Sequence, residues 1–267
     1  MTRTWFFGVG FAALLTIAAG PAPRVTTDTQ DDEQQIGQQT YEELKAKGEI
    51  IASSPLYDTL TPIASAIART AQPYYNHPFK FYLVHEQQPN AFSVPGGNVY
   101  VTDSLLYFVK NSEELAGTLG HEVSHTIHHD SMKLIEKEQQ IERRELGAAI
   151  LLGPTASRVL AISLIGKLHS LGYSRDAESA ADITGSDIAA ASKSNPWGLV
   201  WLFRDFDSAE GNPLPQLLSD HPNNQNRVQA LEKHFKEKPA TFASFSSDQK
   251  TATKMSVPKD SAEVFMH

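Results

Sequence analysis

The chain contains no cysteine, and this absence removes several classes of site at once. Disulfide bonds, thiolate metal ligands and a lipid anchor attached through cysteine are all excluded. Positive charge is also scarce, because acidic residues outnumber lysine and arginine and give a formal net charge of −8. Without a basic run, we expect no nucleic-acid partner. The sequence has no internal repeat and no glycine-rich nucleotide-binding loop, so the candidates for chemistry are histidine and carboxylate side chains.

Long apolar runs are few. Residues 1–23 have a basic start and an apolar stretch typical of an export signal, which is either a cleaved signal peptide or an uncleaved N-terminal anchor. Either form places the rest of the chain outside the cytoplasm, in the periplasm or at a membrane facing it. A second apolar stretch, residues 146–166, is broken by Gly153-Pro154 and carries Arg158. A central arginine costs about 2.5–3.5 kcal/mol in a bilayer, so this stretch predicts a helical hairpin and no membrane span.

The most informative motif is His121-Glu122-Val123-Ser124-His125, which has the form H-E-x-x-H. Residues four apart lie on one face of an α-helix, so His121 and His125 can bind one metal ion. Glu122 would then lie beside that ion, where it can act as a general base toward water. The alternative is a solvated helix face that happens to carry two histidines, and a third ligand would decide against it.

A catalytic zinc ion takes three protein ligands, so one more must come from elsewhere in the chain. The best candidate is Glu178, one turn into a helix that Ser174 is expected to cap. Asp182 lies four residues further along the same face. Its carboxylate can accept the free ring N–H of a liganding histidine and so fix the tautomer of that ring. The alternative is an exposed acidic stripe, but the small alanines between these residues favour close packing against another helix.

Four pieces of the sequence occur in the order of a known family. They are Asn90–Thr102, His121–His125, Gly172–Asp182 and Ser219–Pro222. Together they cover roughly residues 36–236, and the chain resembles the gluzincin zinc metallopeptidases, the family of the CAAX prenyl endopeptidase and HtpX, in its soluble periplasmic branch. His129-Asp130 departs from the usual pattern of that family. His128 and His129 are expected to be surface residues at a helix end.

The resemblance implies one Zn²⁺ per chain with the ligands His121, His125 and Glu178. It implies that Glu122 is the catalytic base and that His221 and Arg227 approach the zinc from the far side. In that role His221 either donates a hydrogen bond to the developing oxyanion or occupies the open zinc position in a resting state. Arg227 holds either a substrate carbonyl or an acidic partner. A histidine that merely begins a helix is the alternative for residue 221.

Two strands are predicted ahead of the motif helix. Residues 79–84 alternate in polarity, and Asn98–Thr102 follows a Pro-Gly-Gly turn, with a loop expected over residues 87–95. In zinc peptidases, an edge strand beside the site holds the substrate backbone by strand addition. The resemblance assigns this role to the substrate-binding residues Asn98, Val99, Tyr100 and Val101. An ordinary core hairpin is the alternative.

These elements predict an α+β fold, in which a mainly helical, zincin-like metallopeptidase domain has a small β-sheet beside the helix that carries H-E-x-x-H. Asn111 is expected to cap that helix, with Glu114 completing a capping box. The domain organisation is a signal peptide or anchor over residues 1–23, a linker over 24–35, the zinc metallopeptidase domain over 36–238 and a flexible tail over 239–267.

The sequence therefore predicts a zinc-dependent endopeptidase with protein or peptide substrates, misfolded or envelope proteins among them. The N-terminus would bring it close to a membrane. A different class is the alternative: a zinc-containing, chaperone-like binding module whose site is inhibited or inactive. A zinc hydrolase of non-peptide substrates is a third candidate, against which only the family resemblance argues.

Overall fold

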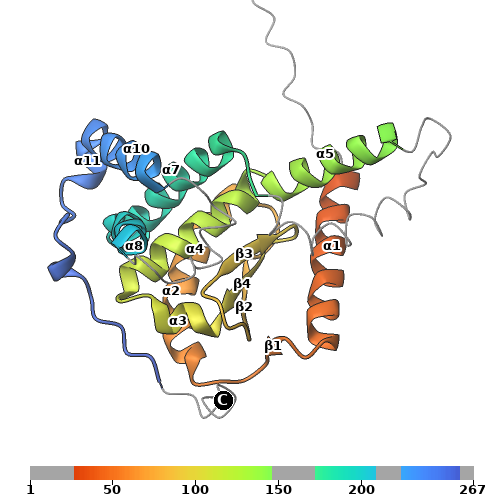
Figure 1. Ribbon diagram of the computed structural model, residues 1–267, viewed down its shortest axis with the longest axis horizontal. Coiled ribbons are helices and arrows are strands. Elements are labelled where there is room, and N and C mark those ends of the chain that lie inside the picture. Colours follow the sequence, from red (N-terminus) through yellow and green to blue (C-terminus); the bar gives the residue numbers. More distant parts are fainter. Residues whose placement is uncertain (1–26, 146–171, 209–223, 259–267) are drawn as a thin grey trace, which may run out of the picture.

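A computed structural model describes residues 27–145, 172–208 and 224–258 of the chain. Figure 1 shows helix α4 (Ser112–Ile127) running between other helices on one side and a small β-sheet on the other. The architecture is α+β and mainly helical, so the expected fold class is confirmed. None of the helices in the described part of the chain is both long and apolar enough to span a membrane.

The remaining elements follow the chain from α1 to the second 3-10 turn. The other helices are α1 (Thr27–Ala46), α2 (Leu56–Ala71), α3 (Asp103–Phe108), α5 (Asp130–Glu145), α7 (Arg175–Ala191), α8 (Trp197–Ser208), α10 (Asn224–Glu237) and α11 (Pro239–Phe242). The strands are β1 (Ile50–Ile51), β2 (Lys80–Val84), β3 (Ala91–Val94) and β4 (Asn98–Thr102). The 3-10 turns are η1 (Gln72–Tyr74) and η2 (Gln249–Thr251).

The sheet has the strand order β1-β2-β4-β3. β4 pairs in parallel with β2 and antiparallel with β3, and all of its residues are buried. Its backbone N–H and C=O groups are therefore committed on both sides. The expectation that Asn98–Val101 form an edge strand for the substrate is wrong. The edge strand nearest α4 is β3. The loop expected over residues 87–95 is also wrong, because Ala91–Val94 pair with β4 and form a strand.

Helix α4 begins where the sequence predicts. The Asn111 Oδ1 accepts a hydrogen bond from the backbone N–H of Glu114 (2.9 Å), as expected for the cap. The return bond of the capping box is displaced by one residue, because the Glu114 carboxylate accepts from the backbone N–H of Lys110 (2.8 Å). The apolar face of α4 is fully buried at Leu115, Leu119 and Val123.

Two helices cross α4 at glycines. Gly120 faces Gly185 of α7, and a Cβ atom built on Gly185 would lie only 2.7 Å from the backbone N of His121. Gly198 of α8 packs against α4 in the same way, since its Cβ would lie 2.1 Å from the carbonyl O of Glu113. Side chains at these points would push the helices apart. The glycines therefore set the distance at which the functional faces of α4 and α7 meet.

The linker expected over residues 24–35 is wrong from Thr27 onward, because α1 begins there. Its buried carboxylate, Glu33, is held by two residues far away in the sequence. The Tyr75 hydroxyl donates to Glu33 Oε2 (2.6 Å), and the His129 Nδ1–H donates to Glu33 Oε1 (2.6 Å). Local composition reads as a linker here, but these long-range bonds hold α1 against the core.

The flexible tail expected over residues 239–267 is wrong as far as residue 258. Phe242 of α11 is only 2% exposed and belongs to the main hydrophobic core. Further along, the Trp201 Nε1–H donates to the carbonyl of Ser247 (3.0 Å). Contacts with the core therefore order this segment, although its own sequence has little periodicity.

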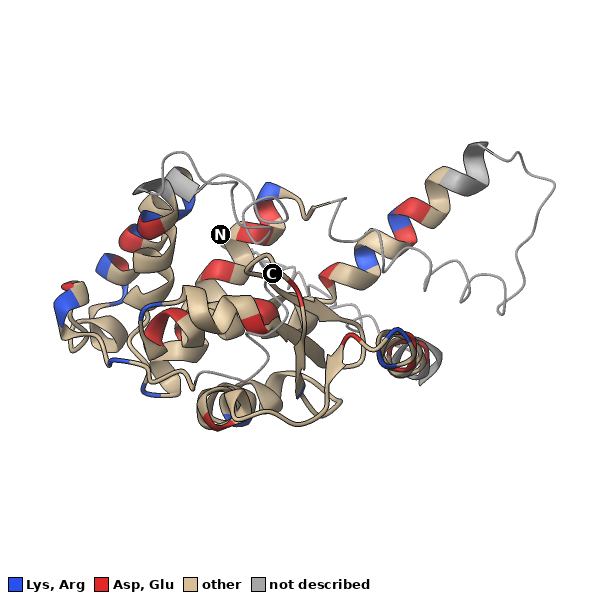
Figure 2. Ribbon diagram, turned by 60° about the horizontal axis from the view of Figure 1, so that its bottom comes forward, with Lys and Arg blue, Asp and Glu red and all other residues tan. Residues whose placement is uncertain are grey.

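Helix α5 follows α4 after a short break that includes His129, which has a positive φ of 55°. Figure 2 shows it extending away from the rest of the molecule, with acidic and basic residues interspersed along it. Its first turns are anchored, since Ser131 and Ile135 are 5% and 1% exposed. The charged helix is thus fixed at the end closest to α4.

Several expectations fall outside the described residues. These are the signal or anchor over residues 1–23, the hairpin over 146–166 and the position of His221. The boundaries proposed for the domain at residues 36 and 238 also stay predictions.

Replacing Gly185 by alanine should destabilise the protein, although alanine is intrinsically better in a helix by about 0.5–1 kcal/mol. The new methyl group would overlap backbone atoms of α4, which cannot move aside as a flexible side chain can. Overpacking of this kind costs about 1–3 kcal/mol. Chemical denaturation of Gly185→Ala should show a lower free energy of unfolding. Ala180→Ser, which also adds one heavy atom but on the exposed face of α7, should stay within about 0.5 kcal/mol of the parent. Equal stability of Gly185→Ala and the parent would contradict the close crossing.

Candidate metal centre

The H-E-x-x-H side chains lie in the C-terminal half of α4 and are buried. His121, Glu122 and His125 are 3%, 1% and 0% exposed. Helix α7, which Ser174 caps as expected, brings Glu178 to the same place with 2% exposure. Two helices distant in sequence thus place their polar side chains in one buried site. The three residues expected as ligands, His121, His125 and Glu178, are therefore brought together.

The donor atoms of His121, His125 and Glu178 all lie within 4.8 Å of one another. The two imidazole Nε2 atoms are 3.0 Å apart. Glu178 Oε2 lies 3.5 Å from His121 Nε2, and Glu178 Oε1 lies 3.6 Å from His125 Nε2. Ligands that hold a tetrahedral zinc at about 2.0–2.1 Å are themselves about 3.3 Å apart. The spacing of the three donors therefore fits a zinc ion with little adjustment.

The other nitrogen of each imidazole is held by a carboxylate. His121 Nδ1 lies 2.9 Å from Asp182 Oδ1, as the sequence predicted for Asp182. His125 Nδ1 lies 3.0 Å from Asp130 Oδ2. A carboxylate at Nδ1 keeps the proton there, so the Nε2 lone pairs of both rings face the space between the ligands. This tautomer is the one that a metal ion requires.

Asp130 is a residue of this site that the sequence analysis missed. It stands five residues after His125, at the first position of α5, and helical spacing gave no reason to turn it back toward the histidine. Burial by itself raises the pKa of this carboxyl, but hydrogen bonds from His125 and Lys133 outweigh burial and lower it. Asp130 is therefore ionised and ready to accept from the imidazole. The departure from the family pattern at this position was the available signal.

Arg227 lies among carboxylates of the protein itself. Its guanidinium makes a two-point contact with Asp182, with Nε 2.7 Å from Oδ2 and Nη2 2.6 Å from Oδ1. Nη1 lies 3.2 Å from Glu178 Oε2, and the group stacks over the Phe203 ring at 4.3 Å. Burial tends to lower the pKa of Arg227, but Asp182 and Glu178 outweigh burial and raise it. Of its two expected roles, the geometry supports the acidic partner, because its donors already face Asp182 and Glu178.

Tyr173 covers the other side of His125. Its ring stacks on the imidazole with centroids 4.0 Å apart and planes 19° apart. The phenol oxygen lies 2.8 Å from Ser131 Oγ, and burial raises the pKa of Tyr173 above its ordinary value. Ser131 Oγ in turn donates to the carbonyl of Ser93 in strand β3 (3.4 Å). The ligand His125 is thus connected through Tyr173 and Ser131 to the edge of the sheet.

The remaining histidines near the motif lie away from the three donors. His128 Nε2 is 3.0 Å from the Thr184 hydroxyl, and His129 pairs with Glu33 while its side chain stays 42% exposed. Both therefore fit the expectation of residues at a helix end. His221 lies outside the described residues, and its role stays a prediction.

A model of peptidase family M48 matches residues 58–234 of this chain. The chain is 27% identical to the mitochondrial metalloendopeptidase OMA1 of Schizosaccharomyces pombe over 165 residues, which is 60% of this chain and 47% of that protein. It is 26% identical to the beta-barrel assembly-enhancing protease of Yersinia pestis over 208 residues, 74% of this chain and 43% of that protein. It is 24% identical to the metalloprotease YcaL of Escherichia coli over 226 residues, which is 83% of this chain and 87% of that protein. The chain thus spans less than half of the first two proteins.

Asp182→Asn and Asp130→Asn should each weaken zinc binding by about 10–100-fold, because an amide in place of the carboxylate is a poorer acceptor for the ring N–H. Zinc affinity can be measured by competition with a chromophoric chelator. Asp176→Asn, on the exposed side of the same helix as Asp182, should leave zinc affinity unchanged. If both buried variants bind zinc as tightly as the parent, the carboxylates do not orient the imidazoles.

Proposed function

Because this chain belongs to peptidase family M48, as its motifs predicted, we propose that it is a zinc-dependent endopeptidase that hydrolyses peptide bonds with Glu122 as general base. The observation that carries the proposal is the grouping of the His121, His125 and Glu178 donors within 4.8 Å beside a buried Glu122. A structural zinc site takes four protein ligands, whereas a catalytic one takes three and keeps a position open. Three donors and an adjacent carboxylate favour an enzyme over a binding module.

When zinc is bound, it acts as a Lewis acid that makes water a stronger nucleophile at neutral pH. Glu122 accepts a proton from the attacking water while the water oxygen forms a bond to the peptide carbonyl carbon. The C–N bond then breaks, and Glu122 delivers the proton to the leaving amine. The products are a new carboxylate and a new amine. The burial of Glu122 keeps competing solvent away from its carboxylate.

Arg227 and Asp182 are proposed to act through the ligands. Asp182 accepts hydrogen bonds from the His121 Nδ1–H and from two N–H groups of Arg227, so this carboxylate is held from two directions. Arg227 also steadies Glu178 through the 3.2 Å contact with Oε2. This arrangement supports a positioning role for Arg227.

The peptide substrate is proposed to bind along β3. This strand lies at the edge of the sheet and packs beside α4, and an extended peptide can pair with such an edge through its backbone. Backbone pairing is indifferent to most side chains, which suits an enzyme for unfolded chains. β4, which the sequence analysis assigned to this task, supports β3 from behind.

Misfolded or envelope proteins are the proposed natural substrates, and the proposed location is outside the cytoplasm. The apolar stretch over residues 1–23 supports export. The relative from Yersinia pestis is named a beta-barrel assembly-enhancing protease, and this name supports the proposal of envelope proteins as substrates. The activity of the longer relatives extends to this chain only as part of the proposal.

The zinc-loaded full chain should cleave an unfolded protein such as casein, and a chelator should abolish the cleavage. Glu122→Gln should retain stoichiometric zinc but lower the cleavage rate by about 10²–10⁴-fold, because the amide cannot take the proton. Glu43→Gln, at an exposed position on α1, should cleave like the parent. Full activity of Glu122→Gln, or no cleavage by the zinc-loaded parent, would overturn the proposal.

Glu178→Ala should bind zinc at least about 100-fold more weakly than the parent, because one of three protein ligands is lost and Arg227 is left partly unpaired. Metal analysis after dialysis reports the zinc content, and denaturation with and without zinc reports the coupled loss of stabilisation by the ion. Glu178→Asp serves as the conservative variant and should recover part of the affinity. Unchanged zinc content of Glu178→Ala would remove Glu178 from the ligand set.

A further inference from the structure

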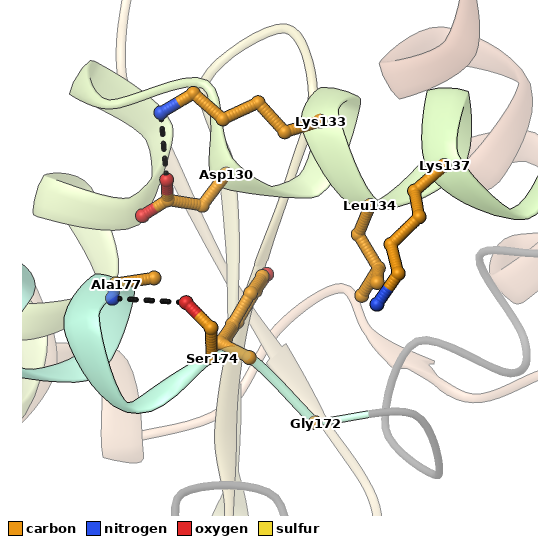
Figure 3. Close-up of a pocket in the computed structure, with 8 residues that line it drawn as sticks. Asp130, Lys133, Leu134, Lys137, Gly172, Ser174 and Ala177 are labelled. Carbon is orange, nitrogen blue, oxygen red and sulfur yellow. Dashed lines mark hydrogen bonds and ion pairs between the residues drawn. The ribbon is translucent and has the colours of Figure 1, made fainter.

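A cavity opens beside the metal centre, on the side of His125. It has a volume of about 340 Å³ and lies between the first turns of α5 and the segment that leads into α7, as Figure 3 shows. Ligand pockets in proteins span roughly 300–1,000 Å³, so the cavity can take a side chain. Asp130 and Tyr173 both line the cavity and both contact His125. The cavity and the candidate zinc site therefore share a wall.

The charge on the lining comes from two lysines and one carboxylate. Both oxygens of Asp130 are already bonded, Oδ1 to Lys133 Nζ (3.1 Å) and Oδ2 to His125 Nδ1 (3.0 Å). Within the described ranges, Lys137 has no ion-pair partner. Figure 3 shows its amine extending along Leu134 toward the cavity. The cavity therefore presents one positive charge that the surrounding described side chains do not neutralise.

The cavity also lies close to the proposed path of the substrate. Ser131 Oγ is 2.8 Å from the hydroxyl of Tyr173, which lines the cavity, and donates to the carbonyl of Ser93 in the edge strand β3 (3.4 Å). One serine side chain thus spans the distance between strand and cavity wall. A peptide lying along β3 can extend a side chain from its backbone into this space, because side chains of an extended chain stand away from the strand on alternate faces.

From this placement we infer that the cavity is a specificity pocket for an acidic side chain of the peptide substrate, and that Lys137 recognises its carboxylate. The inference rests on the proposed function, since it names the substrate class of the same site. The ammonium of Lys137 supplies the charge, while Leu134 and Ala177 supply an apolar wall for the methylene groups. Aspartate and glutamate are accordingly preferred at one position near the cleaved bond.

Peptide binding to zinc-loaded Glu122→Gln tests the pocket without relying on turnover. The probes are short fluorescein-labelled peptides with amidated C-termini, uncharged except for a single glutamate moved through every position, each paired with its glutamine counterpart. Fluorescence anisotropy should give a Kd about fivefold lower for glutamate than for glutamine at one position, as a partly exposed ion pair provides. The difference should shrink as salt is added.

Charge variants in the same Glu122→Gln background identify the residue. Lys137→Met, which keeps an unbranched apolar stem, should abolish the glutamate preference while glutamine peptides bind as before. Lys137→Glu should favour lysine in place of glutamate. Lys236→Glu, an equal charge change at an exposed position on α10, should keep the preference. Equal binding of every glutamate and glutamine pair, or a preference that survives in Lys137→Met, would overturn the inference.

The two proposals fail in different ways. If the parent enzyme cleaves casein but binding shows no glutamate preference, the pocket is wrong and the endopeptidase stands. If cleavage is absent but binding shows a glutamate preference that depends on Lys137, the pocket stands as an acidic-peptide site and the endopeptidase is wrong. A glutamine peptide with a free C-terminal carboxylate provides the last comparison. Tight binding of that peptide alone would assign the pocket to chain ends and overturn the side-chain inference.

Discussion

Helices α4 and α7 meet backbone to backbone at Gly120 and Gly185, and the metal centre depends on that contact. Gly120 immediately precedes the first histidine of the motif, so the crossing point and the ligands are adjacent. The Glu178 oxygens lie 3.5 and 3.6 Å from the imidazole nitrogens, close to the separation that a single zinc ion needs. A displacement of α7 by the width of a methyl group would move the carboxylate out of reach. Close packing is therefore a condition for binding the metal.

The second constraint is the cost of burying charge. Glu122, Glu178 and Asp182 are nearly inaccessible to solvent, and an isolated carboxylate in such a place would be strongly disfavoured. Arg227 and the His121 imidazole offset part of that cost through their contacts with Asp182 and Glu178. Each group is stable only because the others are present. The network consequently behaves as a unit, and removing one partner from a buried pair costs about 3–5 kcal/mol.

The residues around His125 link the candidate metal centre to the edge strand β3 and to the cavity. Asp130 orients the imidazole, Tyr173 stacks on its face, and Ser131 joins Tyr173 to the edge strand β3. The same two residues that touch the ligand also line the cavity next to Lys137. The proposed sites of bond cleavage, backbone pairing and side-chain selection therefore lie next to one another.

Interactions between neighbouring residues were readable from the sequence. The spacing of His121 and His125, the caps at Asn111 and Ser174, and the placement of Asp182 one turn after Glu178 all depend on contacts within about four positions. Helical geometry relates such positions directly, whatever the rest of the chain does. The motif therefore predicted two histidine ligands and a base, and the helix start around Glu178 predicted the third ligand, which the family resemblance also implied.

Contacts between distant parts of the chain were decided only by the tertiary structure. β4 became an interior strand because β3 paired with its free side, and Asp130 reaches His125 across the break between α4 and α5. Glu33 and the segment after residue 238 look like linker and tail by composition, yet Tyr75 and Trp201 hold them to the core. Periodicity records which face of an element is apolar, but it does not record which partner will cover that face.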